Sequence, residues 1–125
     1  MKKTVIGISI GFLIVFSFGI FEMLYLESIT EELISYAEKV ESFTDNDKKA
    51  QEITGFRKLW NKNQKFLSVL VDHQDIHKIE SALVEIESIL KNNLTSSHIS
   101  TNFALLKLYI EDMADERKFT LRNVL

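Results

Sequence analysis

The sequence contains no cysteine and no proline, and it has only four glycines among its 125 residues. Without cysteine the chain cannot form a disulfide framework, a thiolate zinc site, a cysteine nucleophile or an acylated lipoprotein cysteine. Without proline, and with so little glycine, it lacks the turn residues that a β-sandwich or β-barrel needs every 8–12 residues or so. These absences favour an all-helical protein.

An excess of basic residues is also missing. The formal net charge is −3 and the isoelectric point is about 5.6, whereas domains that bind nucleic acid are usually strongly basic. We therefore expect no nucleic-acid partner. A hydrophobic fraction of 46% with 26% charged residues is ordinary for a folded protein and excludes disorder. The length allows one small domain beside the N-terminal segment.

One long apolar run stands at the N-terminus. Residues 4–21 are 18 uncharged residues, near the lower end of the ~17–25 that span a bilayer. Lys2 and Lys3 precede the run, and acidic residues follow it, a pattern that keeps the N-terminus in the cytoplasm. The sequence thus predicts that residues 1–21 anchor the chain in a bacterial cell membrane, with residues 22–125 forming an extracytoplasmic bundle.

A cleaved secretory signal is the alternative interpretation of this run. Two lysines followed by an apolar stretch also begin a signal peptide, and Ser17-Phe18-Gly19 has the small-x-small pattern of a cleavage site. The apolar run nevertheless continues through Ile20 and Phe21, and a helical pattern follows directly. A retained single-pass anchor is therefore favoured.

The run also contains three of the four glycines. Gly7 and Gly11 form a G-x-x-x-G motif, which lets two membrane helices approach each other closely. Glycine is common in membrane spans, so the motif alone does not establish a dimer. A homodimer formed through the anchor stays open at this point.

Apolar spacing predicts four helices. Four segments carry apolar residues separated alternately by three and four positions, as in a helix packed along a neighbour. Their stripes are Leu26, Ile29, Leu33, Tyr36, Val40 and Phe43; Ile53, Phe56, Trp60, Leu67 and Leu70; Ile76, Ile79, Leu83, Ile86 and Leu90; and Ile99, Phe103, Leu106, Ile110 and Met113. The expected architecture is a transmembrane helix followed by an antiparallel up-down four-helix bundle, with the first bundle helix continuing the membrane span.

Polar segments mark the connections and the helix starts. Residues 44–47 and 91–97 are polar enough to be turns, and Asp72-His73-Gln74-Asp75 resembles a capping box with Asp72 as the N-cap. Residues 45–71 carry a net charge of +3 and lie between two acidic segments of −5 and −3. This order suits sequential antiparallel neighbours, although each exposed ion pair contributes less than about 1 kcal/mol.

Recognisable catalytic motifs are missing from the sequence. The nearest arrangement is His73 and His77, one helical turn apart, with Glu80 on nearly the same face, which could form a two-histidine, one-carboxylate metal site. A solvated helix start explains the same residues more simply, so we expect no metal, no cofactor and no enzymatic activity. Trp60 lies on the inward stripe, where core packing is favoured over a ligand platform.

Four basic residues of the second bundle segment have two interpretations. Arg57, Lys58, Lys62 and Lys65 could contact anionic lipid headgroups, because a bundle on a short anchor stays near the membrane. They could instead pair with the acidic helices on either side. Intramolecular pairing is favoured.

The chain also resembles a known family. The residues that carry the resemblance are the anchor after two lysines, Trp60, Asp72-His73 running into Ile76, Ile79-Glu80, Leu83 and the terminal Leu121-Arg122-Asn123-Val124-Leu125. They resemble a domain-of-unknown-function family of short, N-terminally membrane-anchored, all-helical proteins of endospore-forming Firmicutes. The resemblance implies a bacterial inner-membrane setting and a link to sporulation, without any catalytic residue. Asp72, His73 and Glu80 look like its signature, whereas Asp75 and His77 are not attributed to it.

These observations lead to one functional expectation and its rivals. We expect a non-enzymatic, single-pass membrane protein that contacts lipid through residues 4–21 and binds another membrane or envelope protein with its bundle. Trp60, Asp72, His73 and Glu80 are the candidate interaction positions. The alternative is a ligand-sensing ectodomain, as in bacterial receptors, or a metal-binding one. Such receptors normally return to the cytoplasm through a second span, and the sequence has no second apolar run.

Overall fold

The structure, a computed structural model, describes residues 2–92 and 97–124, and for residues 97 and 118–124 it describes the backbone alone. It contains four helices: α1 (Lys2–Ser42), α2 (Asn46–Leu70), α3 (His73–Lys91) and α4 (Ser97–Val124). Most of the expected polar connection at 91–97 lies outside this description. So do the side chains of the C-terminal motif at 121–125.

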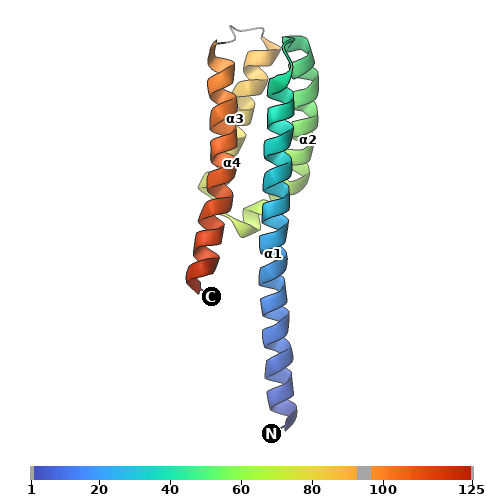
Figure 1. The fold of residues 1–125 in the computed structure, drawn as a ribbon, viewed down its shortest axis with the longest axis vertical. Coiled ribbons are helices and arrows are strands. Elements are labelled where there is room, and N and C mark those ends of the chain that lie inside the picture. The colour runs from blue at the N-terminus through green and yellow to red at the C-terminus, as the bar shows by residue number, and fades with distance from the viewer. Residues whose placement is uncertain (1, 93–96, 125) are drawn as a thin grey trace.

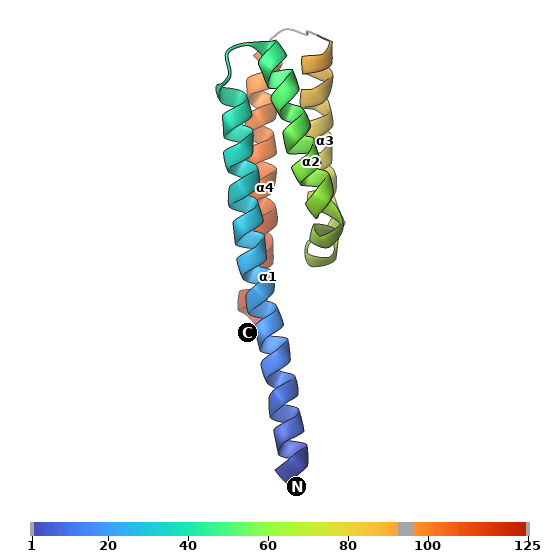
Figure 2. The same ribbon diagram turned by 90° about the vertical axis from the view of Figure 1, so that its right-hand side faces the viewer.

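The four helices pack together as a bundle. α1 packs against α2 and α4, and α3 packs against the same two helices, so the four surround one core. Figures 1 and 2 show the helices side by side, with the α1–α2 turn at one end and the α2–α3 turn at the other. The predicted all-α class and the four packed helices are confirmed.

The apolar run and the first bundle helix form one continuous helix. The membrane-spanning candidate is not a separate helix before the bundle, because α1 is a single helix of 41 residues. Its N-terminal half projects beyond the other helices, and its C-terminal half is one of the four bundle helices (Figure 1). No turn residue interrupts the chain between Phe21 and Leu26, where the apolar stripe begins. The expected continuation of the run into the first bundle helix is therefore found.

The predicted stripes form the core. All the stripe residues of α2, α3 and α4 are buried, together with Leu26, Ile29, Leu33 and Val40 of α1. Tyr36 and Phe43 are only half-buried, and Ala37 rather than Tyr36 faces the centre. Trp60 is the largest of the fully buried side chains, which confirms its predicted place in the core.

A polar contact fills the gap in the α2 stripe. The Tyr25 hydroxyl of α1 donates to Asn63 Oδ1 at 2.6 Å, and Asn63 Nδ2 donates to the Leu59 carbonyl at 2.9 Å. The Tyr25 ring also meets Phe66 edge-on, with centroids 4.8 Å apart. These contacts fix the register of α1 against α2 near the end of the bundle from which the apolar half of α1 projects.

Gly55 is needed for a close approach between α1 and α2. A Cβ at this position would overlap the Tyr36 hydroxyl of α1. Glycine costs a helix interior about 1 kcal/mol relative to alanine, and here the missing side chain leaves room for the tyrosine. This explains why the bundle keeps its one glycine in the middle of a helix.

Aspartates cap the starts of α2 and α3. Asp45 accepts a hydrogen bond from the Asp47 amide at 3.0 Å, and Asp72 accepts one from the Gln74 amide at 3.0 Å. The predicted N-cap role of Asp72 is confirmed. The predicted capping-box role of Asp75 is wrong, because its carboxyl group is buried and shares a hydrogen bond with Glu116 of α4.

The cap at Asp72 provides a test of local stability. Asp72→Ala is expected to lower the free energy of unfolding by ~0.5–2 kcal/mol, since the Gln74 amide loses its acceptor. Asp72→Asn keeps a side-chain oxygen in the same place and should remain close to wild type. Urea unfolding of both variants measures the difference, and equal losses would show that charge rather than capping matters at this position.

Candidate functional site

The strongest polar network of the described residues joins α2 to α3. The buried Trp60 donates its indole N–H to Glu80 Oε2 at 2.7 Å. Arg57 Nη1 lies 2.7 and 2.8 Å from the two oxygens of the same carboxylate, while its Nε and Nη2 donate to Glu87. Two of the four candidate positions, Trp60 and Glu80, are thus in direct contact.

The electrostatics of this network keep Arg57 charged. Its hydrogen bond to Glu87 raises the pKa of Arg57 above the ordinary value, against the lowering effect of burial, and the bond to Glu80 adds to the rise. The expected intramolecular pairing is found for this residue. The network satisfies the buried indole and ties two helices together, so its first consequence is structural.

Asp72 and His73, the other two candidate positions, lie at the exposed start of α3. His73 borders a cavity of about 390 Å³ between α2 and α3, which is also lined by His77 and Glu80. The structure therefore brings both histidines and the carboxylate of the sequence hypothesis to one cavity. Glu80 is nevertheless held by Arg57 and Trp60. Across residues 2–92 and 97–124 no group of three or more histidine, aspartate or glutamate side chains is placed to hold a metal ion.

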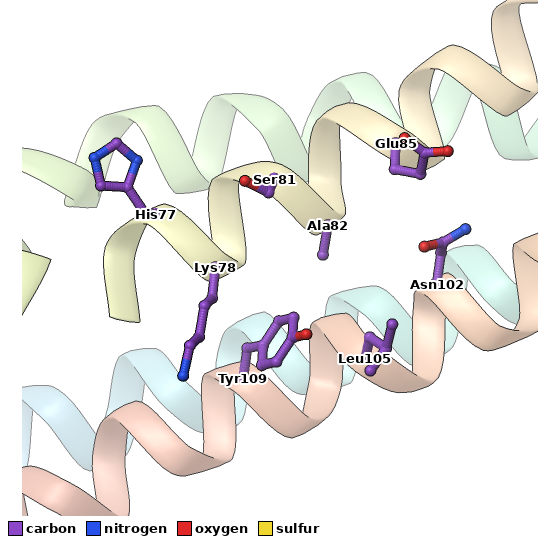
Figure 3. Close-up of a pocket in the computed structure, with 8 residues that line it drawn as sticks. All are labelled: His77, Lys78, Ser81, Ala82, Glu85, Asn102, Leu105 and Tyr109. Atoms are coloured by element: carbon purple, nitrogen blue, oxygen red, sulfur yellow. The ribbon is translucent and has the colours of Figure 1, made fainter. Parts of the chain in front are cut away.

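A second hollow lies between α3 and α4, and Figure 3 shows it. Its volume is about 370 Å³, and its lining residues are His77, Lys78, Ser81, Ala82, Glu85, Asn102, Leu105 and Tyr109. The Lys78 ammonium lies 6.0 Å from the centroid of the Tyr109 ring. Sequence reasoning missed this hollow because its two walls come from helices whose relative register the apolar spacing does not reveal.

An acidic pair lies at the end of the bundle from which α1 projects. Asp75 of α3 is only 5% exposed. Burial, together with the hydrogen bond and negative charge of Glu116 on α4, raises the pKa of Asp75 to about 6. Arg117, next in the chain, donates to Glu22 Oε2 at 2.8 Å and so joins α4 to α1. A cavity of about 180 Å³ separates this group from the α2–α3 turn.

The apolar half of α1 carries most of the exposed large apolar side chains among the described residues. Among the described residues, α1 is the one helix long and apolar enough to cross a membrane, and its most apolar stretch has no buried residue. Phe12 and Val15, for example, are each 72% exposed. Such a helix is consistent with a membrane anchor, and a signal sequence near an N-terminus has the same properties.

Comparison with known proteins gives one match. The model of a family described as a domain of unknown function, DUF4363, matches residues 20–124. No curated protein and no solved structure matches the chain. The match covers the end of the apolar run and all four bundle helices, which confirms the predicted resemblance to a domain-of-unknown-function family. The chain therefore belongs to the DUF4363 family.

Proposed function

We propose that this chain is a single-pass protein of the bacterial cell membrane that holds a helical bundle outside the cytoplasm. The bundle binds another membrane or envelope protein and catalyses no reaction. The exposed apolar half of α1 is the observation that carries this proposal.

Two properties of α1 support a membrane anchor: its exposed apolar surface and the length of its apolar run. Burying a large apolar side chain contributes roughly 1.5–3 kcal/mol, and α1 leaves a whole series of them uncovered. Eighteen helical residues extend about 27 Å, close to the ~30 Å hydrocarbon core of a bilayer. The core of the bundle is already closed by its own four stripes, so lipid is the partner that fits the projecting half.

The orientation is supported by charge. Lys2 and Lys3 lie at the free end of α1, and the first charged residue beyond the apolar run is Glu22. Basic residues are retained on the cytoplasmic side of a membrane, so the bundle lies on the opposite side. Because α1 is continuous, the bundle is held at a fixed position relative to the bilayer rather than on a flexible linker.

Partner binding is supported by the difference in exposure among the four candidate positions. Trp60 is fully buried, and Glu80 is engaged by two donors, so both serve the fold. Asp72 and His73 are exposed and can contact a partner. The central network is fully paired and offers no free acid or base, which supports a binding role over catalysis. A role linked to sporulation rests on the family resemblance alone.

A ligand-sensing or metal-binding ectodomain is the second proposal from the sequence. The metal version needs His73, His77 and Glu80 together, and the Glu80 carboxylate already accepts from Arg57 and Trp60. Binding a metal there would leave the buried indole and the guanidinium without their partner. We therefore favour the protein-binding role.

Cysteine labelling in intact cells tests this function. Since the chain has no cysteine, Ser42→Cys and Asn92→Cys each introduce one thiol at the far, exposed end of the bundle. Both are expected to react with a membrane-impermeant maleimide, while Lys3→Cys should react only after lysis. The same membranes, solubilised in mild detergent, should release the full-length chain together with its bound partner.

Two results would contradict the proposal. Protection of residues 42 and 92 in intact cells would reverse the orientation argued from Lys2 and Lys3. A soluble product that begins near Ile20 would show that the apolar run is a cleaved signal. In either case the bundle itself would remain as described.

A further inference from the structure

We infer that the end of the bundle nearest the anchor is itself seated in the bilayer interface, so that α2 and α4 contact lipid in addition to α1. This membrane-proximal end consists of Phe66 and Val69 of α2 and the backbone turns 118–124 of α4. The inference rests on the proposed insertion of α1 and adds two further lipid contacts. Their position follows from the register of the helices.

The register of α2 places Val69 at the edge of the apolar run. Tyr25 of α1 bonds to Asn63 and packs against Phe66, so these residues share one level. α2 runs antiparallel to α1 (Figure 2) and rises 1.5 Å per residue. Val69, three residues beyond Phe66, is therefore about level with Glu22, where the apolar run ends.

The register of α4 places its last turns deeper still. Arg117 Nη2 lies 2.8 Å from Glu22 Oε2, so Arg117 is near the same level. The helix continues to Val124, seven residues and about 10 Å beyond this contact. Figures 1 and 2 show the end of α4 below the α2–α3 turn, at the height of the apolar half of α1.

The apolar run is too short to cross the bilayer unless residues 118–124 of α4 also lie in it. Its 18 residues extend about 27 Å, against a hydrocarbon core of ~30 Å. A membrane that began below Val124 would leave only about 17 Å of apolar helix, which cannot cross a bilayer. If α1 spans the membrane, residues 118–124 must lie within the lipid boundary.

The surface of the membrane-proximal end suits this position. Val69 is 79% exposed and Phe66 is 39% exposed, although both are large apolar side chains. The exposed Lys62 and Lys65 precede them on α2, and lysine can lay its apolar stem along lipid while its ammonium stays at the phosphates. The acidic Asp72 is also exposed there, so the contact is chiefly apolar rather than electrostatic.

The test measures the depth of single spin labels on the full chain in vesicles of phosphatidylethanolamine and phosphatidylglycerol. Oxygen dissolves in lipid and a nickel chelate stays in water, so their relative collision rates report depth. Labels are placed at Val69→Cys and, one at a time, at residues 119–122, which sample every face of α4. Val84→Cys is the matched control, because Val84 is 49% exposed on α3 about 16 Å farther from the membrane. Leu13→Cys reports insertion of α1.

We expect the ratio of oxygen to nickel collisions to be several-fold higher at Val69, and at the outermost of residues 119–122, than at Val84. If Leu13 reports lipid while Val69 or all four α4 positions match Val84, the inference is overturned and the anchor stands. If a label at Val69 collides with neither oxygen nor the nickel chelate, a second copy of the chain covers this position, and the inference is also overturned. If Leu13 itself reports water, the proposed function fails as well.

Discussion

Replacing Glu80 with alanine is expected to lower the free energy of unfolding of the bundle by about 2–4 kcal/mol. The Trp60 indole N–H is buried and donates to Glu80, so the substitution leaves this donor without a partner. A buried donor left unsatisfied costs about 1–3 kcal/mol, and a hydrogen bond to a charged group contributes a similar amount. Arg57 would also lose one of its two carboxylates.

Two matched variants separate these contributions. Glu80→Gln keeps an oxygen for the indole and removes the charge, so it should cost about 1 kcal/mol. Glu87→Ala removes the other partner of Arg57 and leaves Trp60 satisfied, so it should cost less than about 1 kcal/mol. Trp60, the only tryptophan in the chain, reports unfolding by its fluorescence in urea titrations. Equal losses for Glu80→Ala and Glu87→Ala would show that the indole bond contributes nothing.

The stability of the bundle is expected to fall as pH rises from about 4 to about 6, because of Asp75. Its pKa is about 6 in the folded protein, whereas the ordinary value for aspartate is 3.8. The folded state therefore holds the Asp75 proton more tightly than the unfolded state does. The stabilisation that Asp75 contributes is complete below its ordinary pKa of 3.8. It is lost as pH rises through its folded-state pKa of about 6.

Removing the charge of Asp75 should reverse this loss. Asp75→Asn is expected to stabilise the bundle by about 1–3 kcal/mol at pH 7 and to change little at pH 3, where Asp75 is already neutral. Glu116→Gln should make stability depend less steeply on pH, since Glu116 faces Asp75 from α4 and raises its pKa. The positive charge of Lys78 lowers the pKa of Asp75 and so offsets part of this effect. Urea unfolding across pH 3–8 provides the measurement. Parallel curves for wild type and Asp75→Asn would contradict the assignment.

This carboxyl pair lies where the bundle meets the proposed lipid surface. Asp75 and Glu116 join α3 to α4, and the neighbouring Arg117 joins α4 to α1 through Glu22. Above about pH 6 the loss of the Asp75 proton removes the stabilisation that this buried group contributes at low pH.

Local features of the candidate site could be predicted, and its long-range contacts could not. The N-cap of Asp72 follows from a bond to the amide two residues on, which the chain order alone determines. The same reasoning assigns Asp75 to this cap, but Glu116, 41 positions later, competes for its carboxyl group. A short-range pattern cannot reveal such a competitor. Trp60 and Glu80 were both singled out from the sequence, yet the bond between them was not.

The amino-acid sequence alone predicts the four helices, the faces they bury and the apolar half of α1. Spacing of three and four residues defines a helix face, and the hydrophobic effect places that face inward whichever helix lies opposite. The contacts between side chains of different helices, such as that of Glu22 with Arg117, 95 positions apart, depend on how the helices pack. A stripe repeated every seven residues packs nearly as well after a slide of one repeat, about 10 Å, so spacing leaves the register open. Specific polar contacts and the close approach at Gly55 select one register, and with it the depth at which α2 and α4 end.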